Sequence, residues 1–399
     1  MPKFVFWLGP APSPWDPLTA IEEGIGGSET AAIHLSRELA LLGHQVVVYA
    51  DIHQAMDIDA DDDGKYPCSV DVEWLPYRKM PAHLSCDVFV SSRQPEARQR
   101  VLPSCRQAWL WMHDAHCGPD WENSIGRSYD RVLCLSNWAR TRFLDYYPGV
   151  RPEKVQVTSN GLDTRLFEPF EEASPMPLDN SEGIFTREPS LRYAPGDQHV
   201  HLQTGHTPLR ATFSSSPDRG LSKLLDLWPE ICSVASKMRP EGLRPEGLRP
   251  ELHVYYGFEN WRKIAERHGA APHVLKQIDR LEKRVSTAPG VVYHGRAGQL
   301  EVARSYLRSQ LWLYPTDFEE TSCITAMEAQ AAGCKVVATR RGAVPETSAG
   351  GYFTDGPTTA PGFDARFLEL VWAALNDDSV VTRTPRSWTE VARQWEKWL

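Results

Sequence analysis

Two glutamates at a fixed spacing carry the most specific chemical signal in the chain. Glu320 lies in a polar loop after the short apolar run 311–314, and seven residues separate it from Glu328. We predict a helix between them, with Ser322 as its N-cap and Gly333 at its end. Both carboxylates would then face one crevice and could accept hydrogen bonds from sugar hydroxyls.

The start of this predicted helix also offers hydrogen-bond donors. The backbone amides of Ser322, Cys323 and Ile324 would lack partners within the helix, at its positive end. Such a helix start is a ready binding site for a diphosphate. An ordinary amphipathic helix with a solvated Glu328 is the alternative, because glutamate is common on helix surfaces.

Two cations near the predicted strand 210–213 could bind phosphate. Arg219 and Lys223 lie four residues apart, so we expect them to share a helix face or its entrance. Their charges could neutralise a leaving diphosphate, and an arginine can do so bidentately. For Arg219, the alternative is a surface residue at a helix start.

Glycines open the first predicted helix. Gly26 and Gly27 precede Ser28, the expected N-cap, and would let a phosphate or sugar approach the backbone closely. As a dinucleotide-binding fingerprint the segment is weak, because the preceding loop is long and a third glycine is missing. A tight turn without a ligand remains the alternative.

A histidine follows the predicted strand within residues 107–114. His113 would lie at the carboxyl edge of a parallel sheet, where it could hydrogen-bond a sugar hydroxyl or the acceptor. The alternative is a histidine packed among Trp109, Trp111 and Trp121. Residues 116–128 are polar and aromatic, and we interpret them as an acceptor-side loop.

Buried apolar runs alternate with helical patterns along most of the 399 residues. This alternation predicts an α/β fold with parallel sheets, and the length suits two domains. Residues 168–208 show no clear period, so we expect a surface insertion or a poorly ordered loop. Residues 239–250 contain a five-residue repeat, which favours a surface loop. Residues 388–398 form an amphipathic helix that either packs on the first domain or lies on a membrane surface.

Three segments together resemble a known family. Residues 26–30 (Gly-Gly-Ser-Glu-Thr), 159–163 (Ser-Asn-Gly-Leu-Asp) and 320–328 with the following Ala-Gly-Cys-Lys-Val-Val are similar to retaining GT-B glycosyltransferases of family 4, the "glycosyl transferases group 1" type. The resemblance implies two Rossmann-like domains that face each other across a cleft. Residues 1–167 would form the acceptor-side domain and 209–385 the nucleotide-sugar domain. Residues 168–208 would be the insertion or linker, and 386–399 a helix that returns to the first domain.

The resemblance also implies roles for the candidate residues. Glu328 would hold the ribose hydroxyls, while Glu320 would contact the transferred sugar. Arg219, Lys223 and the helix amides would stabilise the diphosphate. The remaining expected contacts are His113 to the sugar or acceptor, Gly26 and Gly27 to the donor phosphate and acceptor, and Gly342 to the donor base. An arginine that the family commonly has earlier is replaced by Phe213–Ser216, which puts one phosphate-binding cation in doubt.

The implied reaction moves a sugar from a UDP- or GDP-linked donor to a glycan, lipid-linked or protein acceptor, with retention. No metal or other cofactor is expected, and the acidic stretch 57–64 lacks the glutamate that would complete a calcium loop. A sugar-nucleotide epimerase of the same architecture and a non-catalytic nucleotide-sugar or glycan-binding scaffold remain alternatives, the latter favoured by the missing arginine.

Composition limits the other classes. The net charge of −9 argues against sequence-blind nucleic-acid binding. The eight cysteines form no C-x-x-C pair, so no zinc or redox framework is visible, and scattered single cysteines suggest a reducing cytosol. No signal peptide and no membrane-spanning run are predicted. We therefore expect a cytoplasmic protein, for which peripheral membrane contact remains an open alternative.

Overall fold

The computed structural model describes most of the chain as two compact units. The described residues are 1–17, 23–53, 56–57, 72–100, 104–173, 190–203, 207–238, 249–267, 269–348, 350–377, 379 and 385–399. Unit 1 consists of Met1–Asp163, Glu319–Ile324 and Arg386–Leu399, and unit 2 of Thr164–Phe318 and Thr325–Pro385. Residues 168–208, expected to be a separate insertion, therefore group with unit 2.

Unit 1 is built on a largely parallel sheet. Its strand order is β3-β4-β2-β1-β5-β6-β7-β8, and only β3 runs antiparallel to its neighbour within the described residues. The strands are β1 (Lys3–Trp7), β2 (Gln45–Ala50), β3 (Met56–Asp57), β4 (Val72–Pro76), β5 (Cys86–Ser92), β6 (Cys105–Trp111), β7 (Arg131–Cys134) and β8 (Val155–Val157). β1 pairs with β2 on one side and β5 on the other, so the order of the chain reverses there. Ligands bind at such a switch point, beyond the carboxyl ends of the strands.

The sequence predicts the starts of the helices of unit 1 only in part. They are α2 (Gly27–Leu41), α3 (Ala97–Arg100), α4 (Glu122–Ser128), α5 (Asn137–Tyr146) and α14 (Trp388–Glu396). Ser136 caps α5 by accepting a hydrogen bond from the Ala139 amide at 3.0 Å. The prediction that Ser28 caps α2 was wrong: Gly26 occupies the N-cap position, and Ser28 lies in the first turn. The expected loop at 116–128 was also wrong in its second half, which forms α4.

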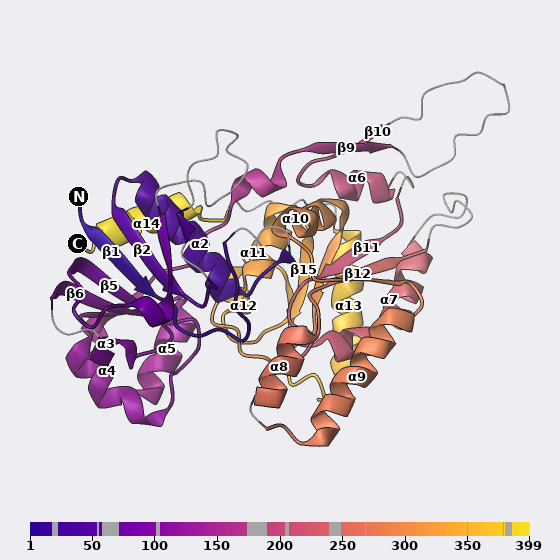
Figure 1. The fold of residues 1–399 in the computed structure, drawn as a ribbon. Helices are drawn as coiled ribbons and strands as arrows, with labels where there is room; N and C mark the ends of the chain where they lie inside the picture. Colours follow the sequence, from indigo (N-terminus) through magenta and orange to yellow (C-terminus); the bar gives the residue numbers. More distant parts are fainter. Residues whose placement is uncertain are drawn as a thin grey trace. The chain divides into compact units, whose positions relative to one another are not determined.

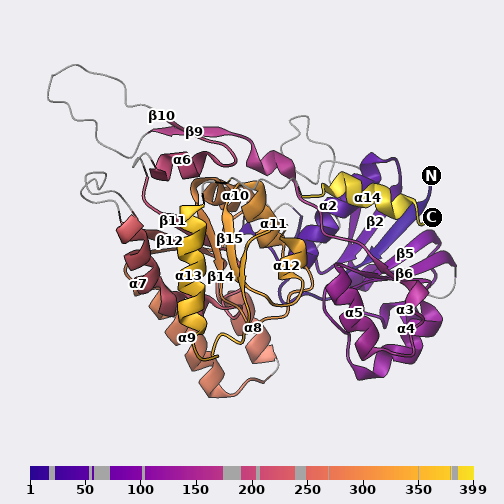
Figure 2. The same ribbon diagram turned by 180° about the vertical axis from the view of Figure 1, so that it is seen from behind.

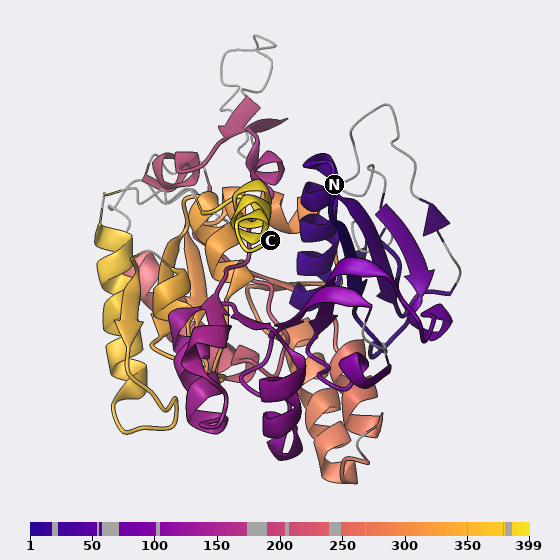
Figure 3. The same cartoon turned by 90° about the vertical axis from the view of Figure 1, so that its left-hand side faces the viewer.

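The terminal helix α14 buries its aromatic face inside unit 1. Trp388 and Trp395 are almost fully buried and share one apolar cluster with residues of α2. The Trp395 indole Nε1 donates to the Thr158 hydroxyl at 2.9 Å. Figure 3 shows α14 nearly end-on, and Figure 1 places both chain termini on unit 1. Because the tryptophan stripe is buried, it is not available to a membrane surface.

Unit 2 contains a parallel sheet with the strand order β13-β12-β11-β14-β15-β16. Its strands are β11 (Arg210–Phe213), β12 (Glu251–Tyr255), β13 (Val291–Gly295), β14 (Leu311–Tyr314), β15 (Lys335–Thr339) and β16 (Tyr352–Thr354). Numbered along the chain, these strands follow the order 3-2-1-4-5-6 of a Rossmann fold. The switch point therefore lies between β11 and β14, which pair directly.

Helices flank this sheet. They are α7 (Leu221–Met238), α8 (Glu259–Arg267), α9 (Pro272–Thr287), α10 (Gln299–Arg308), α11 (Ile324–Ala331), α12 (Val344–Thr347) and α13 (Phe363–Asn376). Figure 2 shows α13 in front of the strands with α7 beside it. Because α11 begins at Ile324, Ser322 lies one residue before the cap position, and the predicted cap was wrong. The predicted end was right: Gly333 adopts φ +87°, and the Cys334 amide donates back to the Ala329 carbonyl.

The described part of 168–208 is more regular than its composition predicted. β9 (Phe170–Ala173) and β10 (Ser190–Tyr193) form an antiparallel pair, and α6 (Asp197–Gln203) follows. The Arg308 guanidinium lies 4.9 Å from the centre of the Phe170 ring and forms an ion pair with Glu172. These long-range contacts order the hairpin and were invisible in the sequence. The repeat at 239–248 and the acidic stretch from residue 58 lie outside the described residues.

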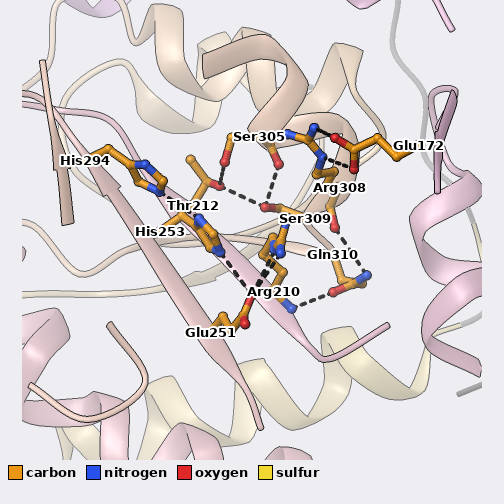
Figure 4. A network of polar contacts seen from close by, with 10 residues as sticks. All are labelled: Glu172, Arg210, Thr212, Glu251, His253, His294, Ser305, Arg308, Ser309 and Gln310. Carbon is orange, nitrogen blue, oxygen red and sulfur yellow. Dashed lines mark hydrogen bonds and ion pairs between the residues drawn. The ribbon is translucent and has the colours of Figure 1, made fainter. Parts of the chain in front are cut away.

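A polar network fixes α10 over the sheet of unit 2 (Figure 4). The Thr212 hydroxyl of β11 is hydrogen-bonded to Ser305 and Ser309 at 2.7 and 2.8 Å. On β12, His253 contacts His294 at 2.9 Å and Glu251 at 3.1 Å.

No helix in the described part of the chain is long and apolar enough to cross a membrane.

Candidate active site

Two loops meet closely at the switch point of unit 2. Residues 214–220 follow β11, and residues 315–318 follow β14. Gly220 has φ +105°, and a Cβ atom there would lie 2.4 Å from the carbonyl oxygen of Pro315. Both the backbone angle and the space therefore require glycine at this position. This contact positions the residue immediately before it, Arg219.

Arg219 and Lys223 have different surroundings. The Arg219 guanidinium lies 4.1 Å from the centre of the Phe318 ring, a cation–π contact. Lys223 forms an ion pair with Asp364 at the start of α13. Because α7 begins at Leu221, Arg219 precedes the helix and Lys223 lies in its first turn, so the two cations lie at the helix entrance rather than on one helix face. The lysine charge is already matched by a carboxylate.

The three serines after β11 all have hydrogen-bond partners within unit 2. Ser214 is hydrogen-bonded to the Tyr306 hydroxyl, Ser215 to Thr325 at 3.3 Å, and Ser216 to Asp218. Their side chains therefore stiffen the loop after β11.

The loop after β14 is tied to the loops at the ends of β15 and β16. The Asp317 carboxylate accepts hydrogen bonds from the amide and hydroxyl of Thr358, at 2.9 and 2.5 Å. The Thr316 amide donates to the Thr339 hydroxyl at 3.1 Å. Gly342, in the turn before α12, has φ +55°, a conformation that glycine favours. The carboxyl edge of the sheet is thus rigidly connected around Phe318.

Glu328 lies on α11, where its side chain is half-buried. Burial raises the pKa of this carboxyl to about 8. Within the described residues, no hydrogen-bond donor or cation contacts the side chain. A carboxyl group that is desolvated and unpaired is typical of a functional site rather than of the solvated helix surface that was the alternative.

His113 follows β6 in unit 1, at the carboxyl edge of that sheet. Its ring lies 4.4 Å from the Trp111 ring, and its buried Nε2 has no hydrogen-bond partner in the described part of the chain. Burial, with a smaller contribution from the Arg93 guanidinium, lowers the pKa of the imidazole to about 3. The ring is therefore neutral near pH 7, packed against tryptophan, and keeps one ring nitrogen for a ligand.

Arg93 joins three segments at the switch point of unit 1, and the sequence analysis missed it. Its Nε donates to Asp114 at 2.7 Å, and its Nη1 donates to the Ser28 hydroxyl at 3.1 Å. Its φ is +66°, unusual for a residue with a side chain. The signal available in the sequence was its position directly after the carboxyl end of a buried strand.

Residues 319–324 group with unit 1 and are anchored there by hydrogen bonds. The Thr321 hydroxyl donates to the His113 carbonyl at 2.6 Å, and the Ser136 hydroxyl donates to the Thr321 carbonyl at 2.8 Å. The Asn160 side-chain amide donates to the Ser322 hydroxyl at 3.1 Å. The segments around Asn160 and Ser322, far apart in sequence, are therefore joined.

The other predicted residues have the following positions. Glu320 is only 5% exposed, and the thiol-bearing Cys323 is also buried. A Cβ atom at Gly27 would lie 3.4 Å from the Ile324 side chain. Glu320 belongs to unit 1 and Glu328 to unit 2, so their common crevice stays a prediction. The described residues contain no cluster of histidine, cysteine, aspartate and glutamate suited to a metal ion.

Solved structures share this architecture over almost the whole chain. HepE of Anabaena, in complex with UDP and glucose, aligns with a TM-score of 0.57 at 15% identity, covering 99% of each chain. Sucrose-phosphate synthase of Thermosynechococcus elongatus gives 0.62 at 12% identity, covering 99% of this chain and 98% of the other. WaaG, a glycosyltransferase of lipopolysaccharide biosynthesis, gives 0.54 at 15% identity, covering 99% and 95%. The chain has the GT-B fold.

The sequence comparison agrees with this fold. Residues 258–377 match the family model described as "Glycosyl transferases group 1". No curated protein matches the chain. The segment that matches this family model contains Phe318, Glu320, Glu328 and Gly342. Residues 1–257, which include Arg219, lie outside the match. The predicted fold of two Rossmann-like halves is confirmed.

Proposed function

We propose that this protein is a retaining, metal-independent glycosyltransferase that uses a nucleotide-diphosphate sugar. The observation that carries the proposal is the Glu328 carboxyl group, half-buried and unpaired within the described residues on α11, in the half that also presents Arg219 at its switch point. A carboxylate suits the two ribose hydroxyls, and a guanidinium suits a diphosphate. The match of residues 258–377 to glycosyl transferases supports this assignment.

In the proposed donor site, Arg219 stabilises the charge that develops on the departing diphosphate. The Phe318 ring beneath its guanidinium restricts the side chain before the donor binds. Stabilising the leaving group in this way is electrostatic catalysis. Because Lys223 is paired with Asp364, we assign the phosphate contact within unit 2 to Arg219. The amides of Ser322, Cys323 and Ile324, which belong to unit 1, stay a predicted phosphate contact.

The sugar and acceptor would be contacted by His113 and Glu320. The neutral imidazole of His113 offers its Nε2 to a hydroxyl group. The acceptor oxygen attacks the anomeric carbon from the face that the diphosphate leaves, so the configuration is retained. The bond from the anomeric carbon to the phosphate oxygen breaks, and the hydroxyl proton passes to that oxygen. Glu320 stabilises the positive charge that develops on the sugar.

The donor base and the acceptor define the substrate screen. UDP- and GDP-linked sugars are the first donors, and UDP-glucose leads because a solved structure of the same fold is a complex with UDP and glucose. Glycan, lipid-linked and protein acceptors are then offered in turn. We place the reaction in the cytoplasm, where these donors are made, and contact with a membrane would be needed only for a lipid-linked acceptor.

The test combines binding with product analysis. Thermal shift against UDP-, GDP- and ADP-sugars identifies the donor, because a ligand that binds only the folded state raises its apparent stability. Mass spectrometry of reactions with that donor, with and without acceptors, should show a glycosylated product whose anomeric configuration matches the donor. An isomerised sugar nucleotide without acceptor would instead indicate an epimerase. Donor binding without turnover across the acceptors would indicate a scaffold.

Two variants test the proposed donor contacts. E328Q and R219A should each weaken the calorimetric affinity for the selected donor by about 1–3 kcal/mol, the value of a charged hydrogen bond. E369Q and R280A, at exposed positions of α13 and α9, are matched controls that should bind as the unchanged protein does. Equal affinities for all four variants would refute the assigned roles.

A further inference from the structure

Two strands of unit 1 begin with cysteines that lie side by side. β5 starts at Cys86 and β6 at Cys105, and these residues are direct partners in the parallel register. The Ser104 hydroxyl donates to the Leu84 carbonyl, which joins the two chains just before the strands begin. The residues are nineteen positions apart in the sequence, so no cysteine motif revealed the pair.

The two thiols differ in environment. Cys86 is 6% exposed, whereas Cys105 is only partly buried. The two thiols are neighbours in the register, and their interaction, together with the Arg98 guanidinium, lowers the pKa of Cys105 while the pKa of Cys86 is raised. The more exposed Cys105 is therefore the more reactive thiol of the two.

Three other cysteines in the described part of the chain have raised thiol pKa values, in contrast to Cys105. Burial raises the pKa of Cys117 and Cys134 to about 12 each, and that of Cys232 to about 11. A buried thiol with a raised pKa is inert towards oxidants. These cysteines serve as internal references for the reactivity of Cys105.

We propose that Cys86 and Cys105 form a reversible dithiol–disulfide pair that hydrogen peroxide oxidises, with Cys105 as the reactive thiol and Cys86 as the resolving thiol. Neighbouring strands lie about 4.8 Å apart, which falls within the range of Cα separations that a disulfide spans, about 4.4–6.8 Å. The side chains of direct partners in a parallel sheet point to the same face, so the sulfurs can meet without a change of register.

The proposed chemistry balances with peroxide as the only oxidant. The Cys105 thiolate attacks one peroxide oxygen, the O–O bond breaks, and the departing hydroxide takes a proton to become water. The resulting sulfenic acid is attacked by the Cys86 sulfur. The S–S bond forms as the S–O bond breaks, and the Cys86 proton leaves with the second water. Two thiols are oxidised and one peroxide is reduced to two waters.

The position of the pair makes it independent of the proposed sugar transfer. Both cysteines lie at the amino ends of their strands, whereas Arg93 and His113 follow the carboxyl ends of the same strands.

Peptide mapping of the whole protein tests the pair directly. After treatment with hydrogen peroxide and blocking of free thiols, trypsin should release the peptide 80–93 linked to the peptide 101–106. Dithiothreitol should separate them. Before oxidation, iodoacetamide at pH 7 should modify Cys105 at least roughly tenfold faster than Cys232, because the thiolate is the nucleophile.

Single variants separate the two roles. C86S should block the cross-link and let Cys105 proceed to the sulfinic acid, whereas C105S should leave Cys86 unmodified. C232S is the matched control and should still form the linked peptide. The proposal is overturned if the unchanged protein yields no 86–105 linkage, or if Cys105 reacts no faster than Cys232. Neither readout depends on a sugar donor, so failure here would leave the proposed activity intact.

Discussion

Glu328 links burial to ligand binding through its state of protonation. With a pKa raised to about 8, the carboxyl group is mostly protonated at pH 7 in the ligand-free protein. A protonated carboxyl accepts hydrogen bonds from ribose hydroxyls less well than a carboxylate does. Donor binding should therefore favour the ionised form and draw a proton off the protein.

This coupling predicts a pH-dependent affinity. The affinity for the selected nucleotide sugar should rise between pH 6 and pH 9, approaching a tenfold gain per pH unit below the pKa if only the carboxylate binds. Titration calorimetry in buffers of different ionisation enthalpy should detect up to one proton released on binding at pH 7. The diphosphate of a nucleotide sugar does not titrate in this range, so the donor's phosphates do not contribute.

A neutral side chain provides the comparison. E328Q should bind more weakly at pH 9 and lose most of the dependence on pH, while E369Q on the exposed face of α13 should keep it. An E328Q protein with an unaltered pH profile would show that another group titrates.

At the scale of elements, the contact between the two loops of unit 2 depends on Gly220. G220A should destabilise the protein by more than the ~1–2 kcal/mol of a left-handed alanine, because its Cβ would also meet the Pro315 carbonyl oxygen at 2.4 Å. Moving that loop should also weaken donor binding through Arg219. Urea denaturation and calorimetry measure the two effects.

Gly295 is the matched control in the same unit. It also has a positive φ, +72°, but a Cβ atom there would meet nothing within 4 Å. G295A should therefore show the backbone cost alone and keep donor affinity. If G220A is no less stable than G295A, the close approach of the two loops is wrong.

Local sequence patterns predicted the strands better than the details at helix ends. The apolar run 311–314 and the predicted strand 210–213 match β14 and β11 residue for residue, because buried parallel strands need such apolar runs. Ser28 and Ser322 were predicted as caps from residue type, yet Gly26 caps α2 and α11 starts later. Cap positions depend on how the preceding loop packs, which short patterns do not encode.

Contacts between distant segments account for what the sequence did not predict in the candidate site. Glu320, Glu328 and His113 were selected from their motifs and strand positions, and His113 does lie at a carboxyl edge. Arg93 was missed because its role depends on Ser28 and Asp114, which only the fold brings to it. The ion pair that engages Lys223 depends on Asp364, far along the chain.

At the scale of the whole molecule, each of the two units is built from segments that are far apart in the sequence. Residues 319–324 and 386–399 return to unit 1, and the described part of 168–208 adds a hairpin and a helix to unit 2. The hairpin is held by Arg308, the last residue of α10, whose ion pair with Glu172 is drawn with the network in Figure 4. Stability of unit 2 should therefore be sensitive to the charges in that network.

Histidine titration predicts how acid affects this network. His294 is partly buried, and desolvation, with the nearby His253 and Arg210, lowers its pKa to about 4. The charged groups around the pair are Arg210, Glu251, Glu301 and Arg308. Between pH 6.5 and about 4, this histidine binds a proton more readily in the unfolded chain than in the folded one. Its contribution to the free energy of unfolding is therefore fully present above pH 6.5 and is lost as the pH falls toward 4.

H294N should therefore flatten the acid side of the stability profile. In urea titrations between pH 7 and pH 4, the midpoint of the unchanged protein should fall steeply, and that of H294N less so, because asparagine cannot gain a proton. H273N, at an exposed position of α9, should keep the original slope. The slopes are compared rather than the absolute stabilities, since losing the contact with His253 has its own cost at every pH. Parallel slopes for all three proteins would show that the histidine pair does not control the acid response of unit 2.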